Sequence, residues 1–261
     1  MRGADLRTGL ARLFLVIAGG LALFWVSMAL PTFRADAGIV EIAKAVVAGE
    51  TFRPGLLDAI VSKAEGGEGS SFRSSVQGKA AVILLRLAED TLRSNDKERS
   101  DKRLDSLTQI IDTALANAPS DPFLWLARFW VDDSRHGFTV RHVPDLRMSY
   151  NLGRYEGWIA IKRNPLALAI LPKLPSDVSE LTILEFVGLV RSGLVSEAAD
   201  IAAGTSPGLR GLLFARLKEL SLDQRRAFAH RFYVKELDDV PVPGISPPLP
   251  QIRMPVLPPD F

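Results

Sequence analysis

Apolar residues recur at every third or fourth position along most of the chain, which is the spacing that places them on one face of an α-helix. The pattern is strongest over 76–92, 104–118 and 176–203, and serine, glycine or proline interrupts it where turns are expected. A strand would need apolar residues at every second position, and the closest candidate, 137–143, is short. We therefore predict an all-α fold with about ten helices beyond residue 38.

One join between two predicted helices, 114–130, reads ALANAPSDPFLWLARFW and is rich in aromatic residues. Pro119 ends the first helix, and Ser120 or Asp121 caps the second by accepting a hydrogen bond from a free backbone N–H. Pro122 then stands in the first turn, where proline is favoured. We expect a tight helix–turn–helix whose aromatic rings pack between stacked helix pairs; these residues are Phe123, Trp125, Phe129 and Trp130.

The same join fits the tetratricopeptide frame of about 34 residues, with Pro119 in the final turn of one repeat and Trp125 near the start of the next. The fit weakens beyond this point. Arg128 occupies a position where the repeat prefers leucine, and 132–145 is inserted before the next helix. We therefore predict stacked antiparallel helical hairpins of an irregular tetratricopeptide-like kind.

The N-terminal region contains a long apolar segment. No charged residue occurs over 13–30, a length at the lower edge of what a helix needs to cross a membrane. Arginines precede this segment, so the positive-inside rule places 1–12 in the cytoplasm. We predict a transmembrane signal-anchor helix at 13–30. Cleavage near Ala35-Asp36-Ala37 stays open as the alternative.

The remaining chain divides by composition. Glycine and serine break the apolar pattern within 31–75, which predicts short helices and a flexible linker, and 76–239 forms the predicted helical domain. The segment 240–261 contains eight prolines, which predicts an extended tail. This tail is either a spacer or, through its interleaved apolar residues, a segment that adheres to a groove on this chain or on a partner.

Charge and composition exclude several classes of protein. The net charge of +2 comes from the N-terminal arginines, and the balanced charge beyond residue 30 argues against a nucleic-acid partner. The chain has no cysteine, so disulfides and thiolate metal sites are excluded, and its three histidines show no paired metal-binding motif. Motifs for a catalytic nucleophile or for a phosphate loop are also missing. We therefore expect no catalytic residue, metal or cofactor, and a protein that is not an enzyme.

One cluster of polar and aromatic residues is a candidate ligand site. Guanidinium groups suit carboxylate or phosphate, and a flat indole stacks on sugar rings, so an acidic saccharide or a lipid-linked sugar is the expected ligand. The candidate residues are Arg135, His136, Arg141, His142, Arg154 and Trp158. The alternative is an exposed loop of ordinary charges beside a core tryptophan with basic neighbours.

Two segments, NAPSDPFLWLARFW at 117–130 and YNLGRYEGWIAIKRNPLALAILP at 150–172, resemble a known group of proteins. These are the tetratricopeptide-like, single-span accessory proteins of proteobacterial surface-polysaccharide biosynthesis, and the resemblance covers about 80–235. It implies a non-enzymatic scaffold in the biosynthesis or export of exopolysaccharide or O-antigen. That scaffold would be anchored in the bacterial inner membrane by 13–30, have the bulk of its chain in the periplasm, and bind protein partners of envelope assembly. The runner-up is a periplasmic glycan-binding module, and the oligomeric state stays open.

Overall fold

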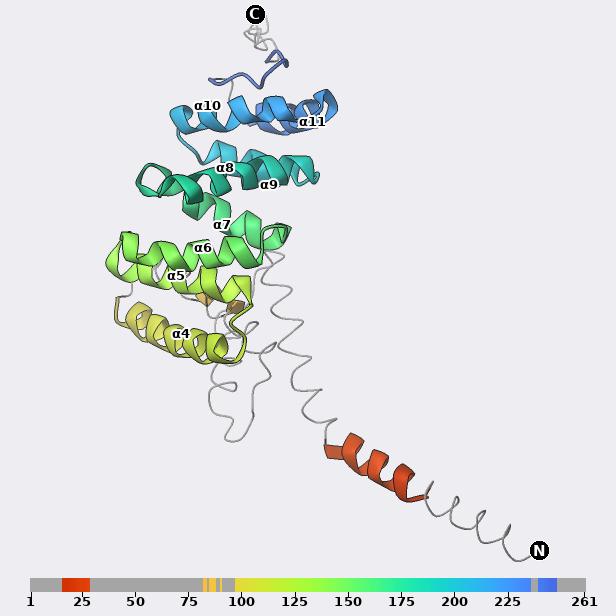
Figure 1. The fold of residues 1–261 in the computed structure, drawn as a ribbon. Coiled ribbons are helices and arrows are strands. Elements are labelled where there is room, and N and C mark those ends of the chain that lie inside the picture. Colours follow the sequence, from red (N-terminus) through yellow and green to blue (C-terminus); the bar gives the residue numbers. More distant parts are fainter. Residues whose placement is uncertain are drawn as a thin grey trace, which may run out of the picture. The chain divides into compact units, whose positions relative to one another are not determined.

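The computed structural model describes residues 16–28, 82–83, 85–87, 90, 97–235 and 239–247. Helices account for most of these residues and no strand occurs among them, so the predicted all-α class is confirmed (Figure 1). The chain divides into two compact units, Met1–Pro119 and Ser120–Phe261. The boundary lies inside the predicted domain 76–239, at the proline-bounded join. The predicted segments 1–12 and 31–75 lie outside the described residues.

The first unit contains a helix at 16–28 and the helix α4 (Lys97–Asn117). One face of α4 is buried, and it carries the apolar residues of the period seen in the sequence: Leu104, Leu107, Ile111, Ala114 and Leu115. Arg103 joins α4 to the preceding segment, because its Nη1 donates a hydrogen bond to the carbonyl oxygen of Leu87 at 2.9 Å. The helix ends just before Pro119, as predicted.

The predicted membrane span at 13–30 is corrected by the structure. Across the ranges given above, no helix combines the length and the apolar character that crossing a bilayer requires. The predicted location, a single-pass protein of the bacterial inner membrane with a cytoplasmic N-terminus and a periplasmic bulk, is therefore wrong.

The second unit is a succession of packed helices. In chain order they are α5 (Pro122–His136), η1 (Val140–His142), α6 (Val143–Leu152), α7 (Gly157–Ala169), η2 (Leu171–Lys173), α8 (Ser176–Arg191), α9 (Val195–Ala203), α10 (Pro207–Arg216), η3 (Leu217–Glu219) and α11 (Leu222–Tyr233). Within this unit α5 packs on α6, α7 on α8, and α9 on both α8 and α11. Figure 1 shows these helices as successive layers from α5 to α11.

Local sequence signals explain several of the helix ends in this unit. Asp121 caps α5, since its Oδ1 accepts hydrogen bonds from the backbone N–H of Phe123 at 2.9 Å and of Leu124 at 3.4 Å. Ser221 and Gln224 form a reciprocal capping box at the start of α11. Pro165 lies inside α7, on its exposed side, although a proline usually ends or kinks a helix. A proline on the solvent side costs no core packing, and the buried face of α7 continues past it.

The aromatic residues at the predicted join are divided between core and surface. Phe123 and Phe129 are buried, whereas Trp125 and Trp130 are half-buried. The ring of Phe123 lies 5.2 Å from the ring of Trp158, which places an aromatic contact between α5 and α7. A close backbone approach accompanies it, because a Cβ atom at Gly153 would lie 2.6 Å from the Cβ of Pro122. Glycine therefore allows the end of α6 to approach the start of α5.

The start of the proline-rich segment packs against the last helices. Val242 is 1% exposed, and its backbone N–H donates a hydrogen bond to the hydroxyl of Tyr233 at 2.9 Å. Arg225 donates to the carbonyl oxygen of Pro243 at 2.5 Å, and Arg210 pairs with Asp239 at 2.6 Å. Residues 239–247 thus adhere to α10 and α11 and do not act as a free spacer. The remainder of the predicted tail, 248–261, lies outside the described residues.

Candidate functional site

The predicted ligand cluster contains a pair of histidines at the end of α5. Arg135 and His136 are the last residues of α5, and Arg141 and His142 belong to η1. The rings of His136 and His142 lie 6.4 Å apart, so the fold brings the two ends of this loop together. His142 is half-buried, and the other three residues are exposed.

The other two predicted ligand residues lie elsewhere. Arg154 belongs to the turn between α6 and α7, and Trp158 contacts Phe123 in the first turn of α5. His136 is the last residue of α5, so the rise of the helix separates it from Phe123 by about 20 Å. The structure therefore does not join the histidine loop to Trp158, and the predicted single site becomes two separate places.

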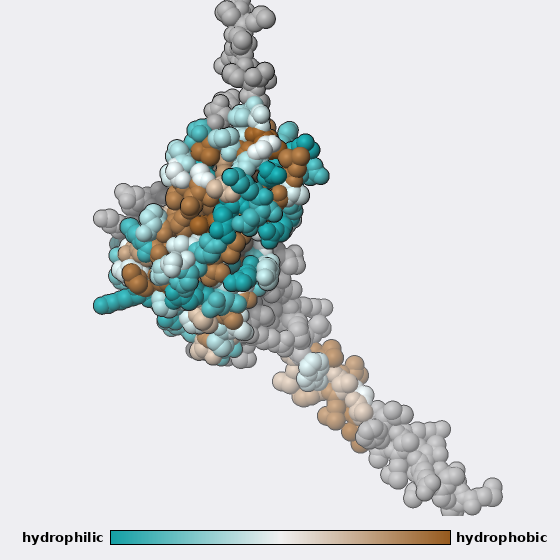
Figure 2. All heavy atoms as spheres, turned by 45° about the horizontal axis from the view of Figure 1, so that its top comes forward, coloured by the Kyte–Doolittle hydropathy of each residue, from teal (hydrophilic) through white to brown (hydrophobic). Residues whose placement is uncertain are grey.

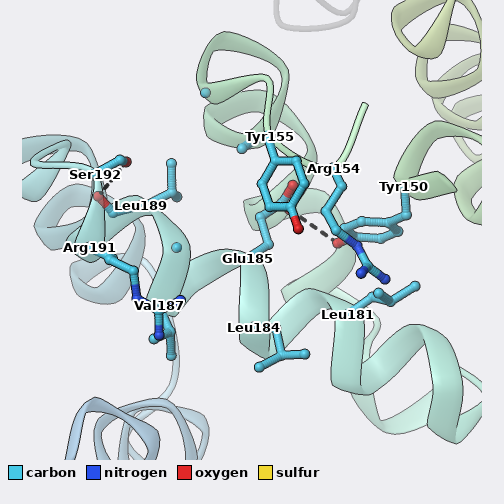
Figure 3. Close-up of a pocket in the computed structure, with 13 residues that line it drawn as sticks. Tyr150, Arg154, Tyr155, Leu181, Leu184, Glu185, Val187, Leu189, Arg191 and Ser192 are labelled. Atoms are coloured by element: carbon cyan, nitrogen blue, oxygen red, sulfur yellow. Dashed lines mark hydrogen bonds between the residues drawn. The ribbon is translucent and has the colours of Figure 1, made fainter. Parts of the chain in front are cut away.

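A groove beside α8 lies near the second of these places. It has a volume of about 350 Å³ and lies between the α6–α7 turn and α8. We call it the α8 groove. Its walls are mostly apolar, with Leu181, Leu184 and Val187 along α8 and Tyr155 contributed by the turn (Figure 3).

The rim of the α8 groove combines exposed apolar side chains with positive charge. Leu184 is 41% exposed and Tyr155 is 92% exposed, although both are large side chains with apolar surface. Figure 2 shows that apolar side chains also reach the surface elsewhere on the molecule, in patches between hydrophilic ones. What is particular here is the charge, since Arg154 and Arg191 also line the groove. In Figure 3 Arg154 lies near Leu181, and Arg191 lies toward the other end of α8.

A buried ion pair supports the floor of this groove. Arg163 of α7 is completely buried, and its Nε and Nη2 donate hydrogen bonds to Oε1 of Glu185 on α8 at 2.9 and 2.5 Å. Its Nη1 donates to the carbonyl oxygen of Ser149 at 2.6 Å, and Nη2 also donates to that of Gly153 at 3.0 Å. The guanidinium also lies over the ring of Tyr150, 4.1 Å from the ring centroid. One side chain therefore joins the end of α6 to α7 and α8.

The second oxygen of Glu185 is also engaged. Its Oε2 accepts a hydrogen bond from the hydroxyl of Tyr150 at 3.2 Å and from Nδ2 of Asn164 at 3.3 Å. Asn164 also donates to the carbonyl oxygen of Thr182 at 2.8 Å, and the hydroxyl of Tyr150 lies 3.1 Å from Oγ1 of Thr182. The carboxylate of Glu185 is thus hydrogen-bonded on both oxygens, as a buried charge requires.

Burial dominates the titration of both acidic groups in this network. Loss of water raises the pKa of Glu185, against the opposing effects of Arg163 and of the hydrogen bonds from Asn164 and Tyr150. Burial and the neighbouring charge of Glu185 raise the pKa of Tyr150 well above its usual range. Tyr150 is therefore a neutral hydrogen-bond donor near neutral pH, and Glu185 has no free oxygen to act as a base.

The site combines an apolar hollow with polar groups that are paired within the protein. In the described part of the chain, no group of three or more histidine, aspartate or glutamate residues is placed to hold a metal ion. The polar groups under the α8 groove bond to one another and leave an apolar hollow with two guanidinium groups at its rim. Such a surface is suited to recognising an apolar group that carries negative charge nearby.

Most residues of this site were not singled out by the sequence analysis. Arg154 was predicted to bind a ligand, but Tyr150, Tyr155, Glu185 and Arg191 were not. One signal was available for Glu185. It lies four positions after Leu181 on α8, and its neighbour Thr182 is also buried, so two polar residues interrupt the face that the helical period marks as core.

Comparisons with known proteins do not identify the chain: no protein-family model matches it, and neither a curated protein nor a solved structure does.

Proposed function

We propose that this chain is a non-enzymatic scaffold that acts through protein contacts, as an accessory protein in the biosynthesis or export of a surface polysaccharide. The observation that supports a binding role is the α8 groove. Its carboxylate is hydrogen-bonded on both oxygens by Arg163, Tyr150 and Asn164, while its apolar walls stay open to solvent. A reaction centre needs a polar group with a free face, whereas a docking surface needs exposed apolar contacts.

The fold adds a second line of support. We propose that the second unit is an irregular array of tetratricopeptide-like hairpins, because α5 packs on α6, α7 on α8 and α8 on α9, each a pair of helices next to one another in the chain. Stacked hairpins of this kind form extended surfaces that bind other chains. The close contact of Gly153 with Pro122 is consistent with the small residues that let paired helices approach.

The link to polysaccharide assembly rests on the resemblance of two segments. The second of these, at 150–172, contains Tyr150, Gly153, Arg163 and Asn164, which are members of the buried network. In this proposal the motif that carries the resemblance is the part of the chain that builds the binding groove. The proposed partners are protein components of envelope polysaccharide assembly.

Photo-crosslinking in cells tests this function. A crosslinking amino acid is placed at Leu184 in the groove and, as a matched control, at Leu222 on α11, which is similarly exposed at 39%. We expect adducts from position 184 with a component of the polysaccharide machinery, and fewer from position 222. We also expect deletion of the gene to reduce surface polysaccharide. An unchanged amount of surface polysaccharide after deletion would contradict the proposal.

A glycan-binding module is the second candidate, and one observation favours it. Tyr155 follows Arg154 in the α6–α7 turn, and Trp158, which is 38% exposed, lies in the first turn of α7. Flat rings beside a guanidinium group suit an acidic sugar. Titration with an oligogalacturonate while tryptophan fluorescence is followed separates the two functions. The scaffold function predicts no change in tryptophan fluorescence. A saturable change in fluorescence that is abolished by Trp158→Phe would favour the glycan-binding module.

A further inference from the structure

We infer that the α8 groove binds an acidic segment of a protein partner, which inserts one large apolar side chain between Tyr155 and Leu184. This inference rests on the proposed scaffold function and specifies the chemistry of its partner. Three features carry it: the shape of the groove, the unpaired charge at its rim, and the rigidity of its floor.

The shape favours a single inserted side chain. A volume of about 350 Å³ lies at the lower end of the range for binding pockets, which is sufficient for one large side chain and the backbone beside it. Leu184 and Tyr155 come from α8 and from the α6–α7 turn, and they border the same hollow (Figure 3). Apolar surface contributed by two elements around one hollow is typical of a site for an anchoring side chain.

The charge at the rim favours an acidic segment. The side chains of Arg154 and Arg191 form no hydrogen bond or ion pair with any residue in the part of the chain that the structure describes. Arginines nearby are paired, such as Arg147 with Asp177 at 2.8 Å and Arg216 with Glu180 at 2.6 Å. Two exposed guanidinium groups remain available beside an apolar hollow, and their planar donor sets match carboxylates.

The floor of the groove holds the groove in its binding shape and does not neutralise the positive charge at the rim. Glu185 is the acidic residue that lines the groove, and its carboxylate is buried and paired with Arg163. It therefore leaves the rim positive. Because the same network joins α6, α7 and α8, the groove is formed before the partner arrives, which lowers the entropic cost of binding.

The experiment uses the purified full chain and two synthetic peptide sets. Each peptide in the first set carries one leucine, phenylalanine or tryptophan between aspartate and glutamate residues, and the second set replaces every acid with lysine. We expect the chain to bind acidic peptides with higher affinity than their lysine counterparts, and leucine, phenylalanine or tryptophan to be required at the central position.

Variants locate the binding. Arg154→Glu/Arg191→Glu lowers affinity for the acidic set by about tenfold or more, because two favourable charge pairs become repulsive. Leu184→Glu abolishes binding, since it places a charge at the apolar contact. Arg231→Glu, a charge reversal on the exposed side of α11, is the control and leaves binding unchanged. Thermal melting of each variant shows that the fold is retained.

Two results with the peptides overturn the inference. One is equal affinity for the acidic and lysine peptides, and the other is binding that Leu184→Glu leaves intact. Competition by oligogalacturonate at the same site would assign the two arginines to a sugar acid and would also overturn it. These results are distinct from failure of the scaffold function, which is measured in cells: adducts from position 184 with a basic or uncharged partner would keep the scaffold and reject the acidic segment.

Discussion

Two regions of the second unit are both fully buried but are built from opposite kinds of side chain. Where α6, α7 and α8 meet, the interior contains Arg163 and Glu185 with their hydrogen-bond partners. Where α8, α10 and α11 meet, it contains a cluster of aromatic rings: Phe214 lies 5.3 Å from Phe228 and 5.0 Å from Phe232 in edge-to-face contacts. The open groove lies over the polar region. Directional bonds hold its walls in place, whereas the aromatic cluster supplies non-directional burial.

This difference has a thermodynamic meaning. A buried ion pair contributes little net stability, because desolvation offsets the Coulomb attraction, but removing one partner is costly. An aromatic cluster contributes through the area it removes from water and tolerates changes that preserve volume. The two regions should therefore respond differently to conservative substitutions.

The largest expected effect comes from removing one member of the ion pair. Arg163→Met lowers the free energy of unfolding by about 3–5 kcal/mol, because it leaves Glu185 buried without its counter-charge. The double variant Arg163→Met/Glu185→Leu recovers most of this loss, since Tyr150 and Asn164 keep Thr182 as a partner. Urea denaturation measures both. If the double variant were no more stable than Arg163→Met, the unpaired charge of Glu185 would not be the cause of the loss of stability.

A smaller loss is expected from one hydrogen bond in the same region. Tyr150→Phe removes a donor to the Glu185 carboxylate and lowers the free energy of unfolding by about 1.5–3 kcal/mol, the value for a bond to a charged group. Denaturation of this variant in the Glu185→Leu background provides the control. There the loss should be smaller, because no charged acceptor remains.

The aromatic region should tolerate a comparable change. Phe228→Leu keeps a large apolar group among Phe186, Phe214 and Phe232 and lowers the free energy of unfolding by less than about 1.5 kcal/mol. The same denaturation assay measures it. A loss as large as that of Arg163→Met would remove the distinction between the two regions.

The smallest effect concerns the pH dependence of two carboxylates on α8, whose pKa shifts have opposite signs. Burial raises the pKa of Glu185, so its stabilising contribution is present below its unfolded pKa of about 4.3 and is lost as pH rises through the folded value. The exposed pair with Arg147 lowers the pKa of Asp177, so that contribution is present above about 3.9 and is lost as pH falls through the folded value.

The stability of the unaltered chain is compared with that of each variant as pH is varied. Relative to Glu185→Gln, the unaltered chain should become less stable as pH rises. Relative to Asp177→Asn, it should become more stable as pH rises. Melting temperatures between pH 3 and pH 7 provide the comparison. If both relative stabilities changed in the same direction with pH, burial would not be the cause of the pKa shift at Glu185 or the surface ion pair would not be the cause at Asp177.

Much of the fold could be predicted from the sequence, and much less of the site. The helical period located the buried face of α4, and Pro119 and Asp121 marked a helix end and a cap. The predicted ligand residues are close to one another along the chain, but the structure places them in two separate regions. Trp158 packs on Phe123 at the start of α5, far from the histidine loop at its end.

The sequence by itself determined the helices and their ends, because periodicity, caps and prolines act over a few neighbouring residues. Only the tertiary structure decided which polar residues share the interior. Arg163 and Glu185 are 22 positions apart, and Tyr150 and Glu185 are 35 positions apart. Nothing local distinguishes a surface arginine from a buried one. That distinction comes from helix packing, which removes water and leaves each charge to find its partner in the folded chain.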